Sequence, residues 1–202
     1  MKQLSVNETV FEKFPVLETE RLRLRQIQMK DAEGLFRFRS DPEAMKYMAR
    51  PLQTDIAETE VMIMNSIESF AARESLYWVI ALKDSDEHIG SAGYWRLKKE
   101  YLRAEIGYQL LPDYQGSGYM AEALKAVISF GFDEFNLHSI EADTDPRNTA
   151  SIKVLEKFGF IREAHFKENV YFEGEFIDSF IYTLFKDAFA KAVKHQLKTS
   201  WV

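Results

Sequence analysis

Residues 104–123 read AEIGYQLLPDYQGSGYMAEA, and this stretch decides the fold more than any other part of the chain. Polar and apolar side chains alternate along residues 104–111, which predicts a strand. A loop with Gly116 and Gly118 follows and leads directly into a predicted helix. Because glycine lacks a Cβ atom, this loop can turn sharply and approach a ligand closely. The first turn of the helix offers free N–H groups at the positive end of its dipole, so the stretch predicts a site for an anionic, phosphate-bearing ligand.

The hydrophobic pattern on either side of this stretch predicts an α/β (α+β) fold. Alternating or short apolar runs predict strands at residues 18–27, 77–82, 89–97, 102–111, 139–144, 160–172 and 176–184. Apolar residues spaced three and four apart predict helices at residues 31–38, 54–70, 118–135, 148–158 and 185–197, the first of them capped by Asp31. Three strands follow one another without an intervening helix, so this is not a regular alternation of parallel units. We expect a mixed central sheet of about seven strands with about four to five helices.

The length of 202 residues favours a single domain with a full hydrophobic core. We expect residues 1–14 to be a flexible N-terminal extension and residues 15–202 to be the domain, which includes a C-terminal amphipathic helix. No apolar run approaches the roughly 20 residues of a membrane span, and the first residues lack the pattern of a secretory signal. These features predict a cytoplasmic protein that does not enter membranes.

Charge and cysteine content exclude several kinds of chemistry. The net charge of −6 argues against nucleic-acid binding, which needs a basic face. The chain has no cysteine, so disulfides, thiolate metal sites and covalent intermediates on cysteine are excluded. The four histidines are not spaced to place two ligands on one helix face, and we therefore expect no metal.

A second motif, Asn148-Thr149-Ala150-Ser151, opens the helix predicted at residues 148–158. Taken alone, Asn148 is an N-cap and Ser151 is an ordinary first-turn residue. Two glycines in a polar loop are, taken alone, an ordinary turn as well. The occurrence of both motifs in this order favours a shared site.

The glycine loop also satisfies the fingerprint of a dinucleotide-binding fold, with Asp143 near the distance expected for an acid that binds ribose. Two observations argue against this alternative. In a dinucleotide fold the strand enters the first glycine directly, whereas residues 112–115 intervene here. The rest of the chain also lacks repeated βαβ units.

Six short blocks occur in order along the chain: LETERLRLR at 17–25, IG at 89–90, EIGY at 105–108, YQGSGYMAEAL at 114–124, NTAS at 148–151 and LEKFGF at 155–160. Together they resemble the GCN5-related N-acetyltransferase (GNAT) family, and within it the ribosomal-protein N-terminal acetyltransferases of the Rim type. The resemblance covers nearly the whole chain. Met120 departs from the Gly or Ala usual in the wider family, but some Rim-type members are similar here.

The resemblance implies an acetyl-CoA site at a place where the strands splay. The pyrophosphate would bind the backbone amides of residues 116–120, and the pantetheine arm would lie against Leu110 and Leu111. The implied cofactor-binding residues are Leu110, Leu111, Gln115, Gly116, Ser117, Gly118, Tyr119, Met120, Asn148 and Ser151.

Acetyl transfer to an amine requires a neutral amine, stabilisation of the oxyanion and a proton for the leaving thiolate. Without cysteine, direct attack is preferred. The resemblance implies that Ser151 is the proton donor and that the backbone N–H near Leu110 stabilises the oxyanion. For the general base, Glu105 is the first candidate and Glu168 the second, although each also fits an ordinary solvated strand residue.

Rim-type similarity implies that the acceptor is the N-terminal amine of a protein. Two alternatives stay open: transfer to a small amine such as an amino acid, polyamine or aminoglycoside, or a module that binds CoA without catalysis. We expect a monomer or homodimer that binds acetyl-CoA and an amine, and neither nucleic acid nor membrane. Tyr171 and Asp178 are weaker candidates for residues that orient the acceptor.

Overall fold

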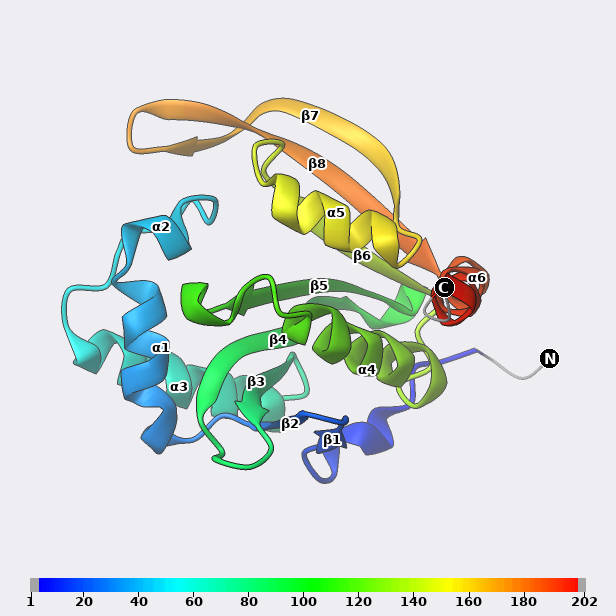
Figure 1. Ribbon diagram of the computed structural model, residues 1–202, viewed down its shortest axis with the longest axis horizontal. Helices are drawn as coiled ribbons and strands as arrows, with labels where there is room; N and C mark the ends of the chain where they lie inside the picture. The colour runs from blue at the N-terminus through cyan, green and yellow to red at the C-terminus, as the bar shows by residue number, and fades with distance from the viewer. Residues whose placement is uncertain (1–3, 200–202) are drawn as a thin grey trace.

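The computed structural model describes residues 4–199, in which eight strands form one sheet in the order β1-β2-β3-β4-β5-β6-β8-β7 (Figure 1). The strands are β1 (Leu17–Glu18), β2 (Leu22–Gln26), β3 (Leu76–Leu82), β4 (His88–Lys98), β5 (Arg103–Leu110), β6 (Ser139–Thr144), β7 (Ile161–Phe172) and β8 (Glu175–Phe185). The α-helices are α1 (Ala32–Arg39), α2 (Pro42–Met45), α3 (Ile56–Ala71), α4 (Tyr119–Asp133), α5 (Thr149–Lys157) and α6 (Lys186–Thr199). The mixed α/β class is confirmed, and the counts are close to those expected.

Helices cover both faces of the sheet (Figure 1). α4 and α5 share the main apolar core with one face, to which Trp78 and Ile80 of β3 belong. α1 and α3 pack on the other face in a smaller cluster that contains Val79, Leu35 and Ile63. Successive residues of a strand point to opposite faces, so β3 contributes to both clusters. Its nearly continuous apolar sequence is the signature of a strand buried on both sides.

Three helix ends have residues that are typical of caps, and Asn148 among them was expected as an N-cap. Asp55 caps α3 in a capping box with Glu58. The Asn148 Oδ1 atom accepts a 3.0 Å hydrogen bond from the Ser151 N–H and caps α5. Gly159 follows the C-terminal end of α5 with φ of +88°, a conformation that favours glycine.

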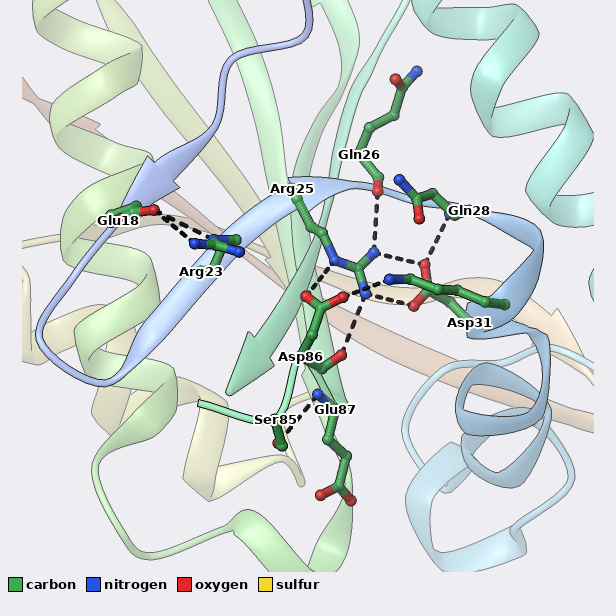
Figure 2. A network of polar contacts seen from close by, with 10 residues as sticks. Glu18, Arg23, Arg25, Gln26, Gln28, Asp31, Ser85, Asp86 and Glu87 are labelled. Atoms are coloured by element: carbon green, nitrogen blue, oxygen red, sulfur yellow. Dashed lines mark hydrogen bonds and ion pairs between the residues drawn. The ribbon is translucent and has the colours of Figure 1, made fainter. Parts of the chain in front are cut away.

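Asp31 differs from its expected role, because its side chain does not cap α1. Its carboxylate forms two 2.8 Å hydrogen bonds with the guanidinium of Arg25 and accepts a third from the Gln28 N–H (Figure 2). Arg25 also donates a 2.8 Å hydrogen bond to Asp86 in the turn between β3 and β4. Arg25 and Asp31 are both buried. The pair therefore links β2 to the start of α1 and to that turn.

The centre of the sheet opens between β5 and β6. These strands run parallel and pair only over Arg103–Glu105 with Ser139–Glu141, whereas every other pairing in the sheet is antiparallel. Beyond Glu105, no described residue of β5 pairs with β6. The expected splaying of the sheet is confirmed, and it leaves a gap in the hydrogen-bonded ladder.

Much of the segment expected to be a flexible extension, residues 1–14, packs on the domain. A short 3₁₀ helix spans Glu8–Phe11. The side chains of Val6 and Phe11 are buried in the main core. Residues 1–3 lie outside the described part of the chain.

The hairpin of β7 and β8 reaches well past α5 at one end of the molecule (Figure 1). Its pairing shifts register twice, and the second shift lies between Phe166 and Val170. The hairpin borders the gap, because β8 pairs with β6.

Candidate active site

The loop between β5 and α4 exposes backbone N–H groups. Gly116 and Gly118 have φ of +76° and +81°, the left-handed region that residues with a Cβ rarely adopt. The first hydrogen bond across the helix boundary runs from the N–H of Glu122 to the carbonyl of Gly118. Among the described residues, the amides from Gly116 to Ala121 therefore have no backbone acceptor. They are free to bind an anion.

Arg21, which lies far from this loop in the sequence, contacts it directly. Its Nη1 atom donates a 3.1 Å hydrogen bond to the carbonyl of Ser117, and its Nε atom lies 2.7 Å from a carboxylate oxygen of Glu122. The guanidinium carbon is 4.2 Å from the centre of the Tyr119 ring. The Thr19 hydroxyl donates to the other oxygen of Glu122 at 2.6 Å. These contacts fix the loop and place the guanidinium of Arg21, paired with Glu122, beside its free amides.

The end of β5 presents a further free amide toward the gap. The N–H of Leu111 donates to the carbonyl of Ile89 at 2.9 Å. Because residues of an antiparallel pair alternate in direction, the N–H of Leu110 points away from β4 and into the gap. The side-chain amide of Gln115 donates to the carbonyl of Leu110 at 3.1 Å. Both leucine side chains are buried, so a ligand here meets the backbone of the strand.

A cavity of about 330 Å³ opens where β5 and β6 separate. It is lined by β4, β5, β6 and β8, by the start of α5, and by the segment that follows α2. Glu105 and Tyr108 of β5 both line it. These residues belong to opposite faces of the strand, because their positions differ by an odd number. The cavity therefore joins the two faces of the sheet.

On one side of the cavity, two hydroxyl groups lie together. The Ser151 Oγ and Tyr108 phenol oxygens are 2.8 Å apart, and the phenol also lies 3.3 Å from the carbonyl of Ser151. Burial raises the pKa of Tyr108 well above its usual range, so the phenol stays neutral. Asn148 also lines the cavity and holds the turn on which Ser151 lies. Ser151 and Asn148 are thus brought together as expected, and Tyr108 is a partner that the sequence did not indicate.

Glu105 lines the cavity but its carboxylate is engaged. One oxygen accepts a 2.8 Å hydrogen bond from the indole N–H of Trp95, and the other lies 2.9 Å from Nη1 of Arg96. The Trp95 ring lies directly on Gly107, where an added Cβ atom would come within 1.6 Å of it. Glu105 is buried. Because both of its carboxylate oxygens are engaged, Glu105 lines the cavity but is not a free base.

Replacing Gly107 by alanine is expected to displace the Trp95 ring. The added methyl group would lie 1.6 Å from that ring, and rotation of the methyl group cannot relieve the clash. Overpacking of this kind costs about 1–3 kcal/mol, which corresponds to a melting temperature lower by roughly 2–12 °C in a domain of this size. Thermal unfolding and near-ultraviolet circular dichroism check this. Wild-type values for both would contradict the packing of Trp95 on Gly107.

Glu168, the second candidate base, does not line the cavity. It lies in the irregular part of β7 with φ of +52°, and its side chain is exposed. Its backbone N–H donates a 2.9 Å hydrogen bond to Asp178, whose other oxygen lies 2.6 Å from Nε2 of His165. The irregular backbone turns the glutamate away, and Asp178 faces the cavity instead. Tyr171 lies near the tip of the hairpin and is exposed.

Sequence reasoning missed several residues that line the cavity: Tyr47, Arg50, Trp95, Tyr108 and Asp143. Asp143 lies on β6, two residues after the last pair with β5. Burial raises the pKa of its carboxyl. The sequence placed Asp143 on a predicted strand and indicated it only as a ribose-binding acid, and nothing in the sequence placed the segment after α2 at this gap.

Within residues 4–199, no group of three or more His, Cys, Asp or Glu side chains is arranged to hold a metal ion. No helix in the described part of the chain is long and apolar enough to cross a membrane.

Comparison with known proteins identifies the family. Residues 21–161 match the model of the acetyltransferase (GNAT) domain. The chain is 38% identical over 178 residues to the uncharacterised N-acetyltransferase p20 of Bacillus licheniformis, which covers 86% of this chain and 98% of that protein. The ribosomal-protein-S5-alanine acetyltransferase of Vibrio fischeri is 25% identical, with a TM-score of 0.72 over 86% of this chain and 97% of that one.

A spermidine N-acetyltransferase of Vibrio cholerae, solved with CoA and spermine, is 18% identical with a TM-score of 0.75 over 85% of this chain and 99% of that one. At this identity the likeness shows the fold. The chain belongs to the GNAT acetyltransferase family. It is an acyltransferase that uses acetyl-CoA to acetylate an amine.

Proposed function

We propose that this N-acetyltransferase acts on the N-terminal α-amine of a protein by direct attack. The observation that carries the proposal is the cavity at the gap between β5 and β6, with a hydroxyl pair on one side and carboxylates on the other. A gap that joins both faces of the sheet lets an acyl donor and an amine approach one another from opposite sides. The absence of cysteine from the sequence excludes an acyl-enzyme on a thiol.

The residues of the glycine loop fit the cofactor. Acetyl-CoA supplies an activated acetyl thioester. The free amides from Gly116 to Ala121, with Arg21 beside them, suit its pyrophosphate. The N–H of Leu110 points into the gap and suits the oxygen on which negative charge develops. Ser151, hydrogen-bonded to Tyr108, is placed to donate a proton to the leaving sulfur.

The chemistry of the amine supports an α-amine as the acceptor. An α-amine has a reference pKa near 7.7–8.0, so roughly a tenth is neutral at pH 7. A lysine amine, with a pKa near 10.4, costs roughly 4–5 kcal/mol to deprotonate at that pH. A single modest base is therefore sufficient to deprotonate an α-amine. The ribosomal-protein acetyltransferase of Vibrio fischeri is consistent with this acceptor class.

The test is an acceptor panel with acetyl-CoA and steady-state detection of the released thiol. Peptides with free Ser, Ala or Met N-termini are compared with spermidine, an aminoglycoside and single amino acids. We expect the peptides to have the largest kcat/KM. Faster turnover of spermidine or an aminoglycoside would show that the acceptor is a small amine and not a protein. CoA binding without transfer to any amine would identify a binding module.

A further inference from the structure

The charged side chains around the cavity are mostly neutralised in pairs. Six acidic or basic side chains line it: Arg50, Arg96, Glu105, Asp143, Asp145 and Asp178. Glu105 is paired with Arg96 at 2.9 Å. Asp145 is paired with Arg147 at 2.7 Å and accepts its backbone N–H as well.

Asp178 accepts two hydrogen bonds that leave its carboxylate engaged. They come from His165 at 2.6 Å and from the backbone N–H of Glu168 at 2.9 Å. These contacts lower the pKa of Asp178, the backbone hydrogen bond first and the histidine second. A carboxylate with a lowered pKa is a poor proton acceptor. Asp178 is thus unsuited to be the base.

Asp143 is different, because no cation lies within 4 Å of it among the described residues. Asp143 is exposed as a residue, but partial desolvation of its carboxyl among the walls of the cavity raises its pKa, and Glu141 on the same strand acts in the same direction. The Ser179 hydroxyl on β8 and the charge of Arg96 on β4 oppose this rise. Asp143 lies on the same face of the sheet as Glu105, since Glu141 is the partner of Glu105 and Asp143 is two residues further. It is therefore the free carboxylate at the gap.

Arg50 is the corresponding free cation. It lies in the segment between α2 and α3, is exposed, and forms no ion pair with any described residue. Cavity residues within its own segment, Tyr47, Met48 and Ala49, carry no acidic group. Outside the carboxylate–arginine pairs, the cavity thus carries the Arg50 guanidinium and the carboxylates of Asp143 and Asp178, and of these two carboxylates only Asp178 is held by a histidine and a backbone N–H.

We propose that Asp143 binds the acceptor's ammonium group and takes its proton, while Arg50 contacts an anionic group on the same acceptor. The inference rests on the acetyl-transfer function proposed above and names its acceptor class: an α-amine with a carboxylate nearby. A polyamine, which carries several positive charges, is repelled by Arg50.

The proton balance of the step is complete. The acceptor's ammonium gives one proton to the Asp143 carboxylate, which later releases it to water. The neutral nitrogen forms a C–N bond to the acyl carbon as the C–S bond breaks. The nitrogen loses its second proton to solvent, the sulfur gains one from Ser151, and Ser151 regains its proton from solvent through the Tyr108 hydroxyl. One acetylated amine, one free thiol and one net proton result.

The test uses the full chain and two peptides that differ only in residue 2, Ser-Glu and Ser-Gln at the N-terminus. Asp143→Asn is expected to lower kcat/KM at pH 7 by about 100-fold or more, the usual contribution of a general base. The wild-type rate should fall as pH drops through the raised pKa of Asp143, and this acid limb should be absent from Asp143→Asn. Calorimetric titration of the peptide into the CoA-bound protein should show weaker binding to the variant.

Asp133→Asn is the matched control, because Asp133 is exposed at the end of α4 and outside the cavity. It should retain wild-type rate and peptide affinity. Asp143→Glu, which keeps the charge, should recover part of the rate and the acid limb. Asp143→Asn with a rate within threefold of wild type and an unchanged pH profile would overturn the role of Asp143. Thermal unfolding of each variant separates loss of function from loss of fold.

Arg50→Gln should lower kcat/KM for the Ser-Glu peptide about three- to fivefold, as expected for an exposed charge pair, and leave the Ser-Gln peptide unchanged. An equal effect on both peptides would overturn the acceptor class. Spermidine should be the poorer acceptor of wild type and improve in Arg50→Gln. If wild type releases no thiol with any amine, the acetyl-transfer proposal itself fails, which is seen before any variant is made.

Discussion

An Asp31→Ala variant should unfold with a free energy about 3–5 kcal/mol lower than wild type, the usual cost of removing one partner from a buried ion pair. Asp31 is 3% exposed and makes two of its three 2.8 Å hydrogen bonds to a single guanidinium, that of Arg25. The substitution leaves the buried Arg25 with Asp86 as its remaining ionic partner (Figure 2). Denaturant unfolding measures the loss, and the melting temperature should fall by roughly 6–20 °C.

The control is Glu18→Gln, which removes a carboxylate from the Arg23 pair in the same region (Figure 2). Both members of that pair are more than 40% exposed, so solvent screens their attraction and the stability is expected to stay close to that of wild type. An Asp31→Ala protein no less stable than Glu18→Gln would contradict the structural role assigned to the buried pair. Apart from the loss of stability, removal of the Asp31–Arg25 pair has a local consequence. The pair lies at the start of α1, and α1 leads into the segment that contributes Arg50 to the cavity.

A Ser151→Ala variant is expected to lose about 100-fold in kcat with CoA affinity near that of wild type. Positioned acids contribute about 10²–10⁴ to a rate. A thiol titrates near pH 8.5, so a thiolate leaves without much help and the lower end of this range applies. The cofactor contacts proposed here are backbone amides, which the substitution leaves in place. Initial rates and calorimetric CoA binding check the two parts.

Thr149→Ala is the control for Ser151→Ala, because Thr149 lies in the first turn of the same helix but is exposed and outside the cavity. Tyr108→Phe removes the phenol oxygen that lies 2.8 Å from Ser151 and should reduce the rate less than Ser151→Ala. An unchanged kcat in Ser151→Ala would remove this residue from the mechanism. An equal loss in CoA affinity would make its role structural.

Local patterns in the sequence were sufficient for most of the fold. The alternation along residues 104–111 and the apolar spacing after Gly118 predicted β5 and α4, because both depend on neighbouring side chains. The N-cap of α5 at Asn148 followed from a single residue type. The expected cap at Asp31 was wrong, since the guanidinium of Arg25 on the preceding strand and the N–H of Gln28 bind its carboxylate instead.

The acid–base part of the site was less predictable, because it depends on which charges pair across the fold. Glu105 has the sequence context of a candidate base, yet Trp95 and Arg96 of the preceding strand engage its carboxylate. Glu168 lies on the expected strand, but a register shift turns it away from the cavity. Asp143 becomes a candidate by the absence of a cation near it, a property that no single-sequence pattern encodes.

The most direct test is amine-dependent thiol release from acetyl-CoA by the wild-type protein, with two peptides of identical sequence, one with a free N-terminal serine and one already blocked. We expect thiol release with the free peptide alone and, by mass spectrometry, one acetyl group on its α-nitrogen. No release with the free peptide, or equal release with the blocked one, would contradict acetylation of an α-amine at the gap between β5 and β6.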